Sequence, residues 1–452
     1  MADRIPPAGP SCREYHRDLF GDLERSDSEI RRLIAREYER LQDTIQLVAA
    51  ENRCSRAVLG ALGSIVQNKT TEGTPGKRLH GGCAIVDRIE QLAVARAKRA
   101  FGAKYANVQP HSGTTANQIV LAAVLNKGDR ILSMATLHGG HFSHGYIDSL
   151  TAKLFHIEEY CVDRETLLLD YERIAEQARR FRPRLLICGA SAYTRIIDFA
   201  ELRKIADKVG AYLLADVSHI SSLIIAGAHP SPIDYAHFTT TSTYKPGGPR
   251  GGLILMGNDF DTRVNTRGGL VPLWKLIDKT TFPGLQGTPY LNNIAGKAVF
   301  FREMLSRQYK VRQFKIIENA KRLAANLVSR GYCLLTGGTD NHMLLVNVAK
   351  SCNGLTGLIA QKALEECGIV TDKMLLPYDA KGPDITSGLR LGTPIVTRNG
   401  MGLAEMDELA EIIDAVLKRM KPLGDSHYRL DGTFTRRIRR QTKTIASKFP
   451  MR

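Results

Sequence analysis

The chain has 452 residues, of which 43% are hydrophobic and 24% are charged, and its formal net charge at pH 7 is +17. This length and composition predict an ordinary globular protein with more than one core. No run reaches the roughly 18 uninterrupted apolar residues of a membrane span, and no charged segment followed by an apolar run opens the sequence, so we expect a cytoplasmic protein rather than a secreted or membrane one.

Residues 1–40 are predicted to form an N-terminal arm and a helix. The proline-rich start indicates a loose arm over the first twenty residues. Ser26 and Glu29 have the spacing of a capping box, and apolar residues from Ile30 to Leu41 recur at helical spacing. We therefore expect a helix with one apolar side.

Residues 41–297 are predicted to form a large α/β domain. From about residue 80 to residue 260, short apolar runs such as 184–188 and 212–215 alternate with helical patterns such as 86–97, which is closed by Gly102. This alternation is typical of strand and helix units around a largely parallel sheet. Residues 298–452 begin with a long helical pattern, and we expect them to form a smaller domain with a basic tail.

The positive charge is spread along the chain, apart from one dense run at 436–440. Such a charge attracts anions over long distances. We interpret the basic run as a solvated face, and a nucleic-acid footprint is the alternative.

The eight cysteines occur without a paired C-x-x-C spacing. This pattern argues against a structural zinc site, so we expect reduced thiols and no metal.

A turn of small polar residues follows the apolar run 105–108. It reads His111-Ser112-Gly113-Thr114-Thr115 and is followed by an apolar helical pattern. In a parallel sheet, ligands gather at the carboxyl ends of the strands, and the start of a helix presents N–H groups that suit a phosphate. Ser and Thr also form ordinary helix caps, so this turn alone leaves both interpretations open.

Two further strand ends carry polar residues. Ser191 follows one apolar run, and Asp216 ends the next, with His219 three positions later. A carboxylate at a strand end is what a pyridoxal cofactor needs, because an anion beside the ring nitrogen keeps that nitrogen protonated. A helix cap is the alternative for Asp216.

Lys245 stands between a hydroxyl-rich run, 239–243, and a glycine-rich turn, 247–252. Exposure at the surface explains this setting poorly. A lysine amine held beside cationic or apolar neighbours loses its proton readily and condenses with an aldehyde. With Asp216, it predicts an enzyme that holds pyridoxal 5'-phosphate and makes or breaks a bond at the α-carbon of an amino acid.

From about residue 30 to residue 420, the chain resembles the serine hydroxymethyltransferase family of fold-type I pyridoxal-phosphate enzymes. The resemblance implies a large domain with a mainly parallel seven-stranded sheet and a smaller C-terminal α+β domain. It rests on blocks in the same order at 72–78, 109–114, 138–141, 189–193, 216–219, 282–287, 339–342 and 387–394.

The resemblance also implies how the cofactor is held. Lys245 would carry it as a Schiff base, His141 would stack on its ring, and Asp216 would pair with its pyridine nitrogen. The ring's 3'-oxygen would lie near Ser191 and His219, and the phosphate would be bound by Ser112, Gly113, Thr114, Thr243 and, from a neighbouring subunit, Gly287.

Substrate contacts follow from the same resemblance. Arg390 would clamp the substrate carboxylate through a forked pair of hydrogen bonds. Glu72 would reach across the interface and manage the proton of the substrate hydroxyl. Because each site would use two chains, the resemblance implies a homodimer or a tetramer with shared active sites. The implied catalytic residues are Lys245, Glu72, His141, Asp216 and His219.

Several residues depart from the family pattern on the amino-acid side of the pocket. Ala50 stands where the family has serine, and Thr70 replaces a tyrosine. Leu79 and His80 replace a pair of tyrosines, and Tyr244 replaces the histidine before the lysine. We expect Thr70 and His80 to contact the substrate in a wider, less phenolic pocket.

Two departures concern tetrahydrofolate. Met374 stands where the family has an asparagine that reads the pterin, and Thr136 replaces a leucine of the folate cleft. A thioether cannot replace the paired hydrogen bonds of an amide, and a lost buried pair costs about 1 to 3 kcal/mol.

The resemblance and its departures support more than one function. The first is a hydroxymethyltransferase of one-carbon metabolism that interconverts serine, or an α-methylserine-type amino acid, with glycine or alanine and uses tetrahydrofolate as carrier. The second is a folate-independent aldolase or threonine transaldolase with another aldehyde acceptor. An ordinary family member with neutral substitutions is a further interpretation. A nucleic-acid-binding protein, suggested only by charge, ranks far behind.

Overall fold

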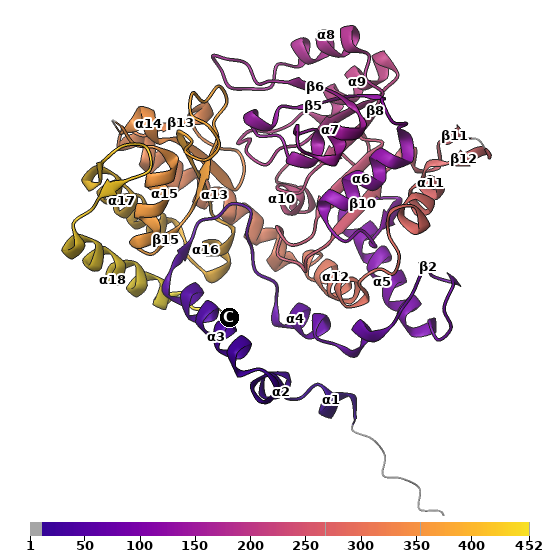
Figure 1. The fold of residues 1–452 in the computed structure, drawn as a ribbon, viewed down its shortest axis with the longest axis horizontal. Coiled ribbons are helices and arrows are strands. Elements are labelled where there is room, and N and C mark those ends of the chain that lie inside the picture. The colour runs from indigo at the N-terminus through magenta and orange to yellow at the C-terminus, as the bar shows by residue number, and fades with distance from the viewer. Residues whose placement is uncertain (1–10, 267, 353, 452) are drawn as a thin grey trace, which may run out of the picture.

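The computed structural model describes residues 11–266, 268–352 and 354–451, and Figure 1 shows two lobes. The larger lobe is built on a seven-stranded sheet in which β10 is antiparallel to both neighbours and the other strands run parallel to one another. The predicted α/β fold class is therefore confirmed. In spatial order the strands are β4 (Tyr105–Asn107), β10 (Gly252–Met256), β9 (Phe238–Ser242), β8 (Tyr212–Asp216), β7 (Leu185–Cys188), β5 (Arg130–Met134) and β6 (His156–Tyr160).

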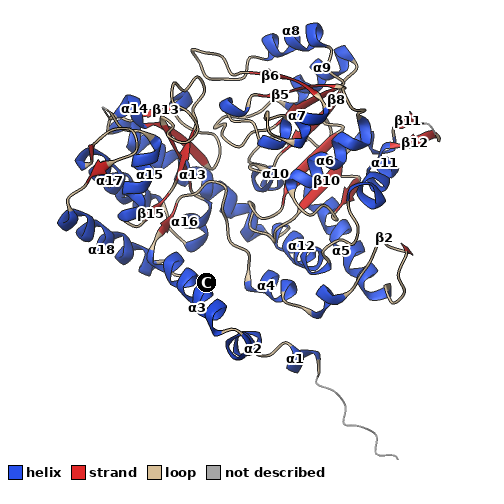
Figure 2. Cartoon of the chain, viewed as in Figure 1, coloured by secondary structure: helices blue, strands red, loops and turns tan. Residues whose placement is uncertain are grey.

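Helices cover this sheet, as Figure 2 shows, and the central strands β7, β9 and β10 are buried along their whole length. Burial on both faces accounts for their continuous apolar or hydroxyl-rich sequences. The helices of this lobe are α4 (Arg56–Leu62), α5 (Ala84–Phe101), α6 (Gly113–Val124), α7 (Leu150–Leu154), α8 (Tyr171–Phe181), α9 (Phe199–Val209), α10 (Ser221–Ala226), α11 (Leu273–Lys279) and α12 (Leu291–Met304).

The end of α5 agrees with its sequence signal, and an aspartate caps the start of α9. Gly102 follows α5 with φ 70°, a left-handed conformation that glycine adopts without strain. Asp198 caps α9, and its side chain accepts a hydrogen bond from the Glu201 N–H.

The smaller lobe contains an antiparallel sheet in the order β13 (Cys333–Leu334), β14 (Met343–Asn347), β17 (Gly388–Gly392) and β16 (Asp372–Met374). Its helices are α13 (Arg307–Ser329), α14 (Val348–Ser351), α15 (Gly357–Glu366), α16 (Pro394–Asn399), α17 (Leu403–Arg419) and α18 (Gly432–Lys448). Among the described residues, no helix combines the length and hydropathy needed to cross a membrane. Short two-stranded pairs complete the chain: β2 (Gly73–Thr74) with β3 (Lys77–Arg78), β11 (Arg263–Thr266) with β12 (Gly269–Pro272), and β18 (Lys421–Pro422) with β19 (Tyr428–Arg429).

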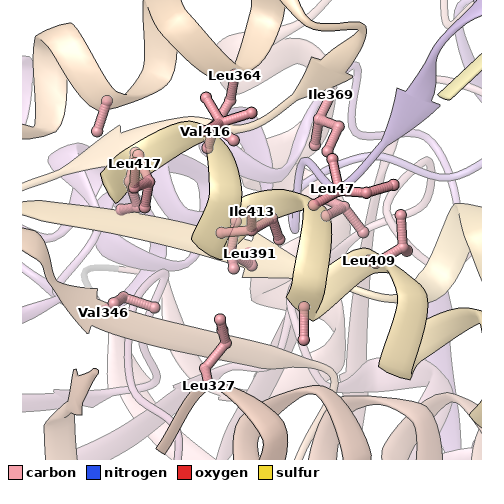
Figure 3. Close-up of a cluster of buried hydrophobic side chains, with 14 of the residues drawn as sticks. Leu47, Leu327, Val346, Leu364, Ile369, Leu391, Leu409, Ile413, Val416 and Leu417 are labelled. Atoms are coloured by element: carbon pink, nitrogen blue, oxygen red, sulfur yellow. The ribbon is translucent and has the colours of Figure 1, made fainter. Parts of the chain in front are cut away.

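The core of the smaller lobe includes a segment from the start of the chain. Strand β1 (Ile45–Gln46) pairs with β15 (Ile369–Val370), and Figure 3 shows Leu47 among Ile369, Leu391 and Ile413. The sequence-based division assigned this segment, within 41–297, to the large domain. It packs with the small domain instead, because the buried side chains of Ile45 and Leu47 are part of that domain's core.

The N-terminal segment differs from its prediction. The first ten residues lie outside the described chain, but α1 (Cys12–Tyr15) and α2 (Leu19–Ser26) replace the loose arm expected up to residue 20. The helix α3 (Ser28–Asp43) begins after Asp27, whose side chain accepts a hydrogen bond from the Ile30 N–H, so the predicted Ser26 capping box is wrong. Ser26 already ends α2.

The basic run 436–440 lies on α18. Its arginines are exposed, while Phe434 and Ile438 on the same helix are buried in the small-domain core. This arrangement agrees with a solvated basic face on an amphipathic helix.

Candidate active site

A cavity of about 390 Å³ lies where the carboxyl ends of the large domain's strands face the small domain. Large-domain loops supply one side, and β16 and β17 supply Met374 and Arg390. A mixed apolar and polar cavity of this kind suits a small molecule. Its lining includes Ala50, Thr136, His141, Ser191, His219, Tyr244, Lys245, Lys373, Met374, Leu375 and Arg390.

Lys245 is connected to Asp216 by a chain of hydrogen bonds. The Lys245 Nζ donates to Ser242 Oγ at 3.3 Å. The Ser242 N–H donates to Ser218 Oγ at 2.9 Å, and the Ser218 hydroxyl donates to Asp216 Oδ1 at 2.6 Å. The amine and the carboxylate that the sequence singled out therefore belong to one connected site.

Asp216 is a buried carboxylate held by four hydrogen bonds. Its Oδ2 accepts from Asn117 Nδ2 at 2.8 Å and from His144 Nε2 at 3.2 Å, and its Oδ1 accepts from the N–H of Ser218 at 3.0 Å as well as from that residue's hydroxyl. Burial alone would raise the pKa of Asp216, but the hydrogen bond from His144, its charge and that of His141, and the bond from Ser218 hold the pKa well below its usual range. Asp216 is therefore an anion at neutral pH.

Two histidines line the cavity in neutral form. Burial lowers the pKa of His141 to about 4, and its Nδ1 lies 2.8 Å from Ser143 Oγ. Burial and the nearby charges of Lys245 and Arg390 also lower the pKa of His219, whose ring stacks on His342 with centroids 5.7 Å apart. The buried Nδ1 of His219 has no hydrogen-bond partner among the described residues.

The turn before α6 is built as the sequence predicts. Ser112 caps the helix, and its Oγ accepts a hydrogen bond from the Thr115 N–H at 3.0 Å. Gly113 packs so closely that a Cβ there would lie 3.2 Å from the backbone nitrogen and Cβ of Ser242. Thr114 is exposed in the first turn. This turn thus adjoins the Lys245 chain through Ser242, and the first N–H groups of a helix suit an anion.

Thr243 lies beside this turn but uses its hydroxyl within the fold. Its Oγ1 donates to the Pro249 carbonyl at 2.6 Å, and its side chain is buried. Ser242 presents its hydroxyl to Lys245 instead.

Arg390 is held by Asp372 and Ser191. Its Nε and Nη2 donate to Asp372 Oδ2 at 3.2 and 2.8 Å, and its Nη1 donates to the Ser191 carbonyl at 2.6 Å. A guanidinium has five N–H donors, so one hydrogen on Nη1 and one on Nη2 remain. Both remaining N–H groups can donate to a substrate carboxylate.

Four predicted site residues gather elsewhere on the same chain. Glu72, Thr70, His80 and Gly287 do not line the cavity. The Glu72 N–H donates to His80 Nδ1 at 3.4 Å, and a Cβ on Gly287 would lie 3.2 Å from Glu72 Oε1. Thr70, His80 and Gly287 are exposed. Figure 1 shows the adjoining hairpin strand β2 on the side of the large domain turned away from the small domain.

The residues around the cavity fit pyridoxal 5'-phosphate. The N-terminus of α6 would bind the cofactor's phosphate, and the Lys245 amine would condense with its aldehyde. The buried carboxylate of Asp216 would pair with its pyridine nitrogen. The orphaned Nδ1 of His219 is a further polar atom in need of a partner.

Several site residues escaped the sequence analysis. Two of them, Ser218 and Ser242, link Asp216 to Lys245. Asn117 donates a hydrogen bond to the Asp216 carboxylate, and Asp372 accepts hydrogen bonds from Arg390. Ser218 and Ser242 lie inside motifs that were singled out, so their positions beside Asp216 and Lys245 were the available signal. Asn117 lies within an apolar helical pattern, and nothing in its spacing distinguishes it.

Comparison with known proteins agrees with the geometry. The model of the family described as "Serine hydroxymethyltransferase" matches residues 23–413. The chain is also 46% identical over 430 residues to a protein named "Serine hydroxymethyltransferase" from Nostoc punctiforme (strain ATCC 29133 / PCC 73102), with 95% of each chain covered. The chain therefore belongs to the serine hydroxymethyltransferase family of pyridoxal-phosphate-dependent transferases.

Proposed function

We propose that the protein is a hydroxymethyltransferase that interconverts serine and glycine and passes the one-carbon unit to tetrahydrofolate. The observation that carries the proposal is the hydrogen-bonded connection from Lys245 to Asp216 beside the remaining N–H groups of Arg390. Family membership supports the same reaction.

The chain's own residues have separable tasks in this reaction. The bound cofactor supplies an electron sink for the bond broken at the α-carbon. Asp216 keeps a negative charge at the ring nitrogen, and Arg390 orients the carboxylate of the amino acid. Because burial lowers the pKa of His141 to about 4, its ring is neutral at pH 7 and would stack on the cofactor's ring.

We further propose that the preferred amino acid carries an α-substituent, as in α-methylserine formed from alanine. Ala50 lines the cavity together with Lys245 and Arg390, and it lacks the hydroxyl that the family places there. A methyl side chain at this position lowers the polarity of the wall and leaves room for a further methyl group.

A folate-independent aldolase or threonine transaldolase is the second candidate. Met374, Leu375 and Thr136 line the same cavity as Lys245. The wall that carries the substitutions is therefore part of the candidate active site and not of a distant surface. Because Met374 offers no paired hydrogen bonds, this wall favours an aldehyde acceptor that does not depend on a pterin.

We propose that the active site is shared between two copies of the chain. Glu72 and Gly287 lie together in an exposed region that does not line the chain's own cavity. Contributed to a partner's cavity, Glu72 would exchange a proton with the substrate hydroxyl, and His80 and Thr70 would contact the same substrate. The mass of the assembly in solution distinguishes a dimer from a tetramer.

We place the enzyme in the cytoplasm. All eight cysteines are free, including the buried Cys83, Cys188 and Cys367. Free thiols in this number are typical of a reducing compartment.

A substrate screen with and without tetrahydrofolate tests the proposal. Glycine, D- and L-alanine, serine and threonine would be mixed with the cofactor-loaded protein, and long-wavelength absorbance and product formation would be followed. We expect tetrahydrofolate to increase the absorbance with glycine or alanine. An increase confined to alanine would identify the α-substituted substrate.

The same screen separates the alternatives. Turnover of threonine without any effect of tetrahydrofolate would identify the aldolase or transaldolase. Absence of turnover with every amino acid in the cofactor-loaded protein would refute both functions.

A further inference from the structure

Lys297 is a buried lysine to which the proposed function gives no role. It lies on α12, and its side chain is 1% exposed. Its Nζ donates to the carbonyl oxygens of Val108, Pro110 and Gly252 at 2.6, 3.2 and 2.8 Å. Three acceptors match the three hydrogens of an ammonium group, so this setting can accommodate the amine in its charged form.

The ammonium group lies directly behind the turn that would hold the cofactor's phosphate. Pro110, one of its acceptors, precedes His111 and Ser112 in that turn. Gly251 leaves the space for it, because a Cβ there would lie 2.8 Å from the Lys297 Nζ and 3.1 Å from Thr243 Oγ1. The charge is therefore close to two predicted phosphate contacts.

This charge lacks a paired anion in the described part of the chain, where no carboxylate forms an ion pair with Lys297. Glu90 of α5 is the carboxylate that raises the pKa of Lys297, but it already has partners of its own. It forms an ion pair with Arg78 at 2.5 Å and accepts a hydrogen bond from Gln109 Nε2 at 2.8 Å. A buried cation without a partner is costly, and the cost falls when an anion binds nearby.

We propose that Lys297 is the buried counter-charge of the cofactor's phosphate, and that phosphate binding is coupled to uptake of a proton by this amine. The inference rests on the proposed phosphate site at Ser112–Thr114. Lys297 is a positioning residue, since its contacts are with the carbonyl groups behind the turn.

The titration of the site supports the coupling. Burial lowers the pKa of Lys297 to about 7, and Glu90 opposes this shift. Arg78 and Asp87 are the charged groups that act on Glu90, and the neighbouring His111, whose pKa is lowered by burial and by Lys297, is neutral above pH 7. A bound phosphate would raise the pKa of Lys297. Binding at a pH above about 7 would therefore be accompanied by uptake of a proton from solution by this amine.

Pyridoxine 5'-phosphate is the probe, because it lacks the aldehyde and cannot condense with Lys245. Pyridoxine without the phosphate is the matched ligand. From about pH 7 to about pH 9, we expect the ratio of their affinities for the cofactor-free protein to fall by roughly tenfold per pH unit, until the pKa of the bound state is reached. Calorimetry in buffers of different ionisation enthalpy should show uptake of close to one proton at about pH 8 for the phosphorylated ligand only.

Variants identify the titrating group. Lys297→Met and Lys297→Gln should abolish the proton uptake and flatten the affinity ratio, whereas Lys104→Met, at an exposed lysine, should change neither. The pH dependence should survive in Glu90→Gln. Its loss in Glu90→Gln with retention in Lys297→Gln would assign it to the carboxylate and overturn the proposal.

The unmodified protein gives a test that does not depend on how the variants fold. Binding of pyridoxine 5'-phosphate without proton uptake at pH 8 would overturn the role of Lys297 and leave the cofactor site intact. Failure of the phosphorylated ligand to bind at any pH would overturn the cofactor site itself.

Discussion

Replacing Asp216 by asparagine should destabilise the cofactor-free protein although the shape of the side chain is kept. The carboxylate accepts bonds from Asn117 and His144 on one oxygen and from Ser218 on the other. An amide has only one oxygen, so its NH₂ group must face either the Asn117 amide or the Ser218 N–H, both of which are donors. Two buried donors then lose their acceptors, at about 1 to 3 kcal/mol each, which predicts a loss of about 2 to 6 kcal/mol at pH 7.

The pH dependence of this loss is set by the lowered pKa of Asp216. A carboxylate whose folded pKa lies below its unfolded value contributes stability above the unfolded pKa, near 3.9, and loses it as the pH falls toward the folded pKa. The stability difference between wild type and Asp216→Asn should therefore shrink by about 1.4 kcal/mol per pH unit below about pH 4.

Urea unfolding at pH 7 and at several pH values below 5 measures both effects. Asp148→Asn is the control, because Asp148 is an exposed aspartate. Equal stability of the two variants at pH 7, or a deficit in Asp216→Asn that stays constant in acid, would refute the reasoning about the Asp216 hydrogen bonds.

Three other substitutions test the cavity. Lys245→Ala should abolish the visible absorbance of lysine-bound cofactor while the circular dichroism stays unchanged, and normal turnover would contradict its role. Met374→Asn should tighten tetrahydrofolate binding about 5- to 150-fold, the equivalent of about 1 to 3 kcal/mol, if the pterin lies against this wall; equilibrium titration that shows no change would place it elsewhere. Asp372→Ala should raise the KM for the amino acid about tenfold with little change in kcat, because Arg390 loses a charge-assisted bond that orients it; an unchanged KM would count against that anchor.

The sequence indicated which residues would lie at the ends of the strands. Asp216 ends the buried strand β8, Ser191 and Lys245 come after β7 and β9, and these strand ends lie at one edge of the sheet. Ser112 caps α6, which is one of the two interpretations that the sequence left open for this turn. These successes share a cause, because alternating strands and helices leave few ways to arrange a parallel sheet.

Contacts between segments distant in the sequence were not predictable in the same way. Asp372 and Arg390 are opposed through the register of β16 and β17, which no local pattern fixes. The two-residue strand β1 is too short to show a period, so its place in the small domain's core was missed. Lys297 sits in an apolar helical pattern, and only the three carbonyl groups around it reveal why a charge is tolerated there.

The cavity draws on two separately packed cores. Lys245 belongs to the large lobe, whereas Arg390 lies on a strand of the small lobe and touches the other lobe through the Ser191 carbonyl. The large lobe would bind the nitrogen of the amino acid, and the small lobe would bind its carboxylate. A bound amino acid would therefore connect the two lobes. Substrate analogues that keep both groups should consequently make the lobes melt as a single unit, and analogues lacking the carboxylate should not.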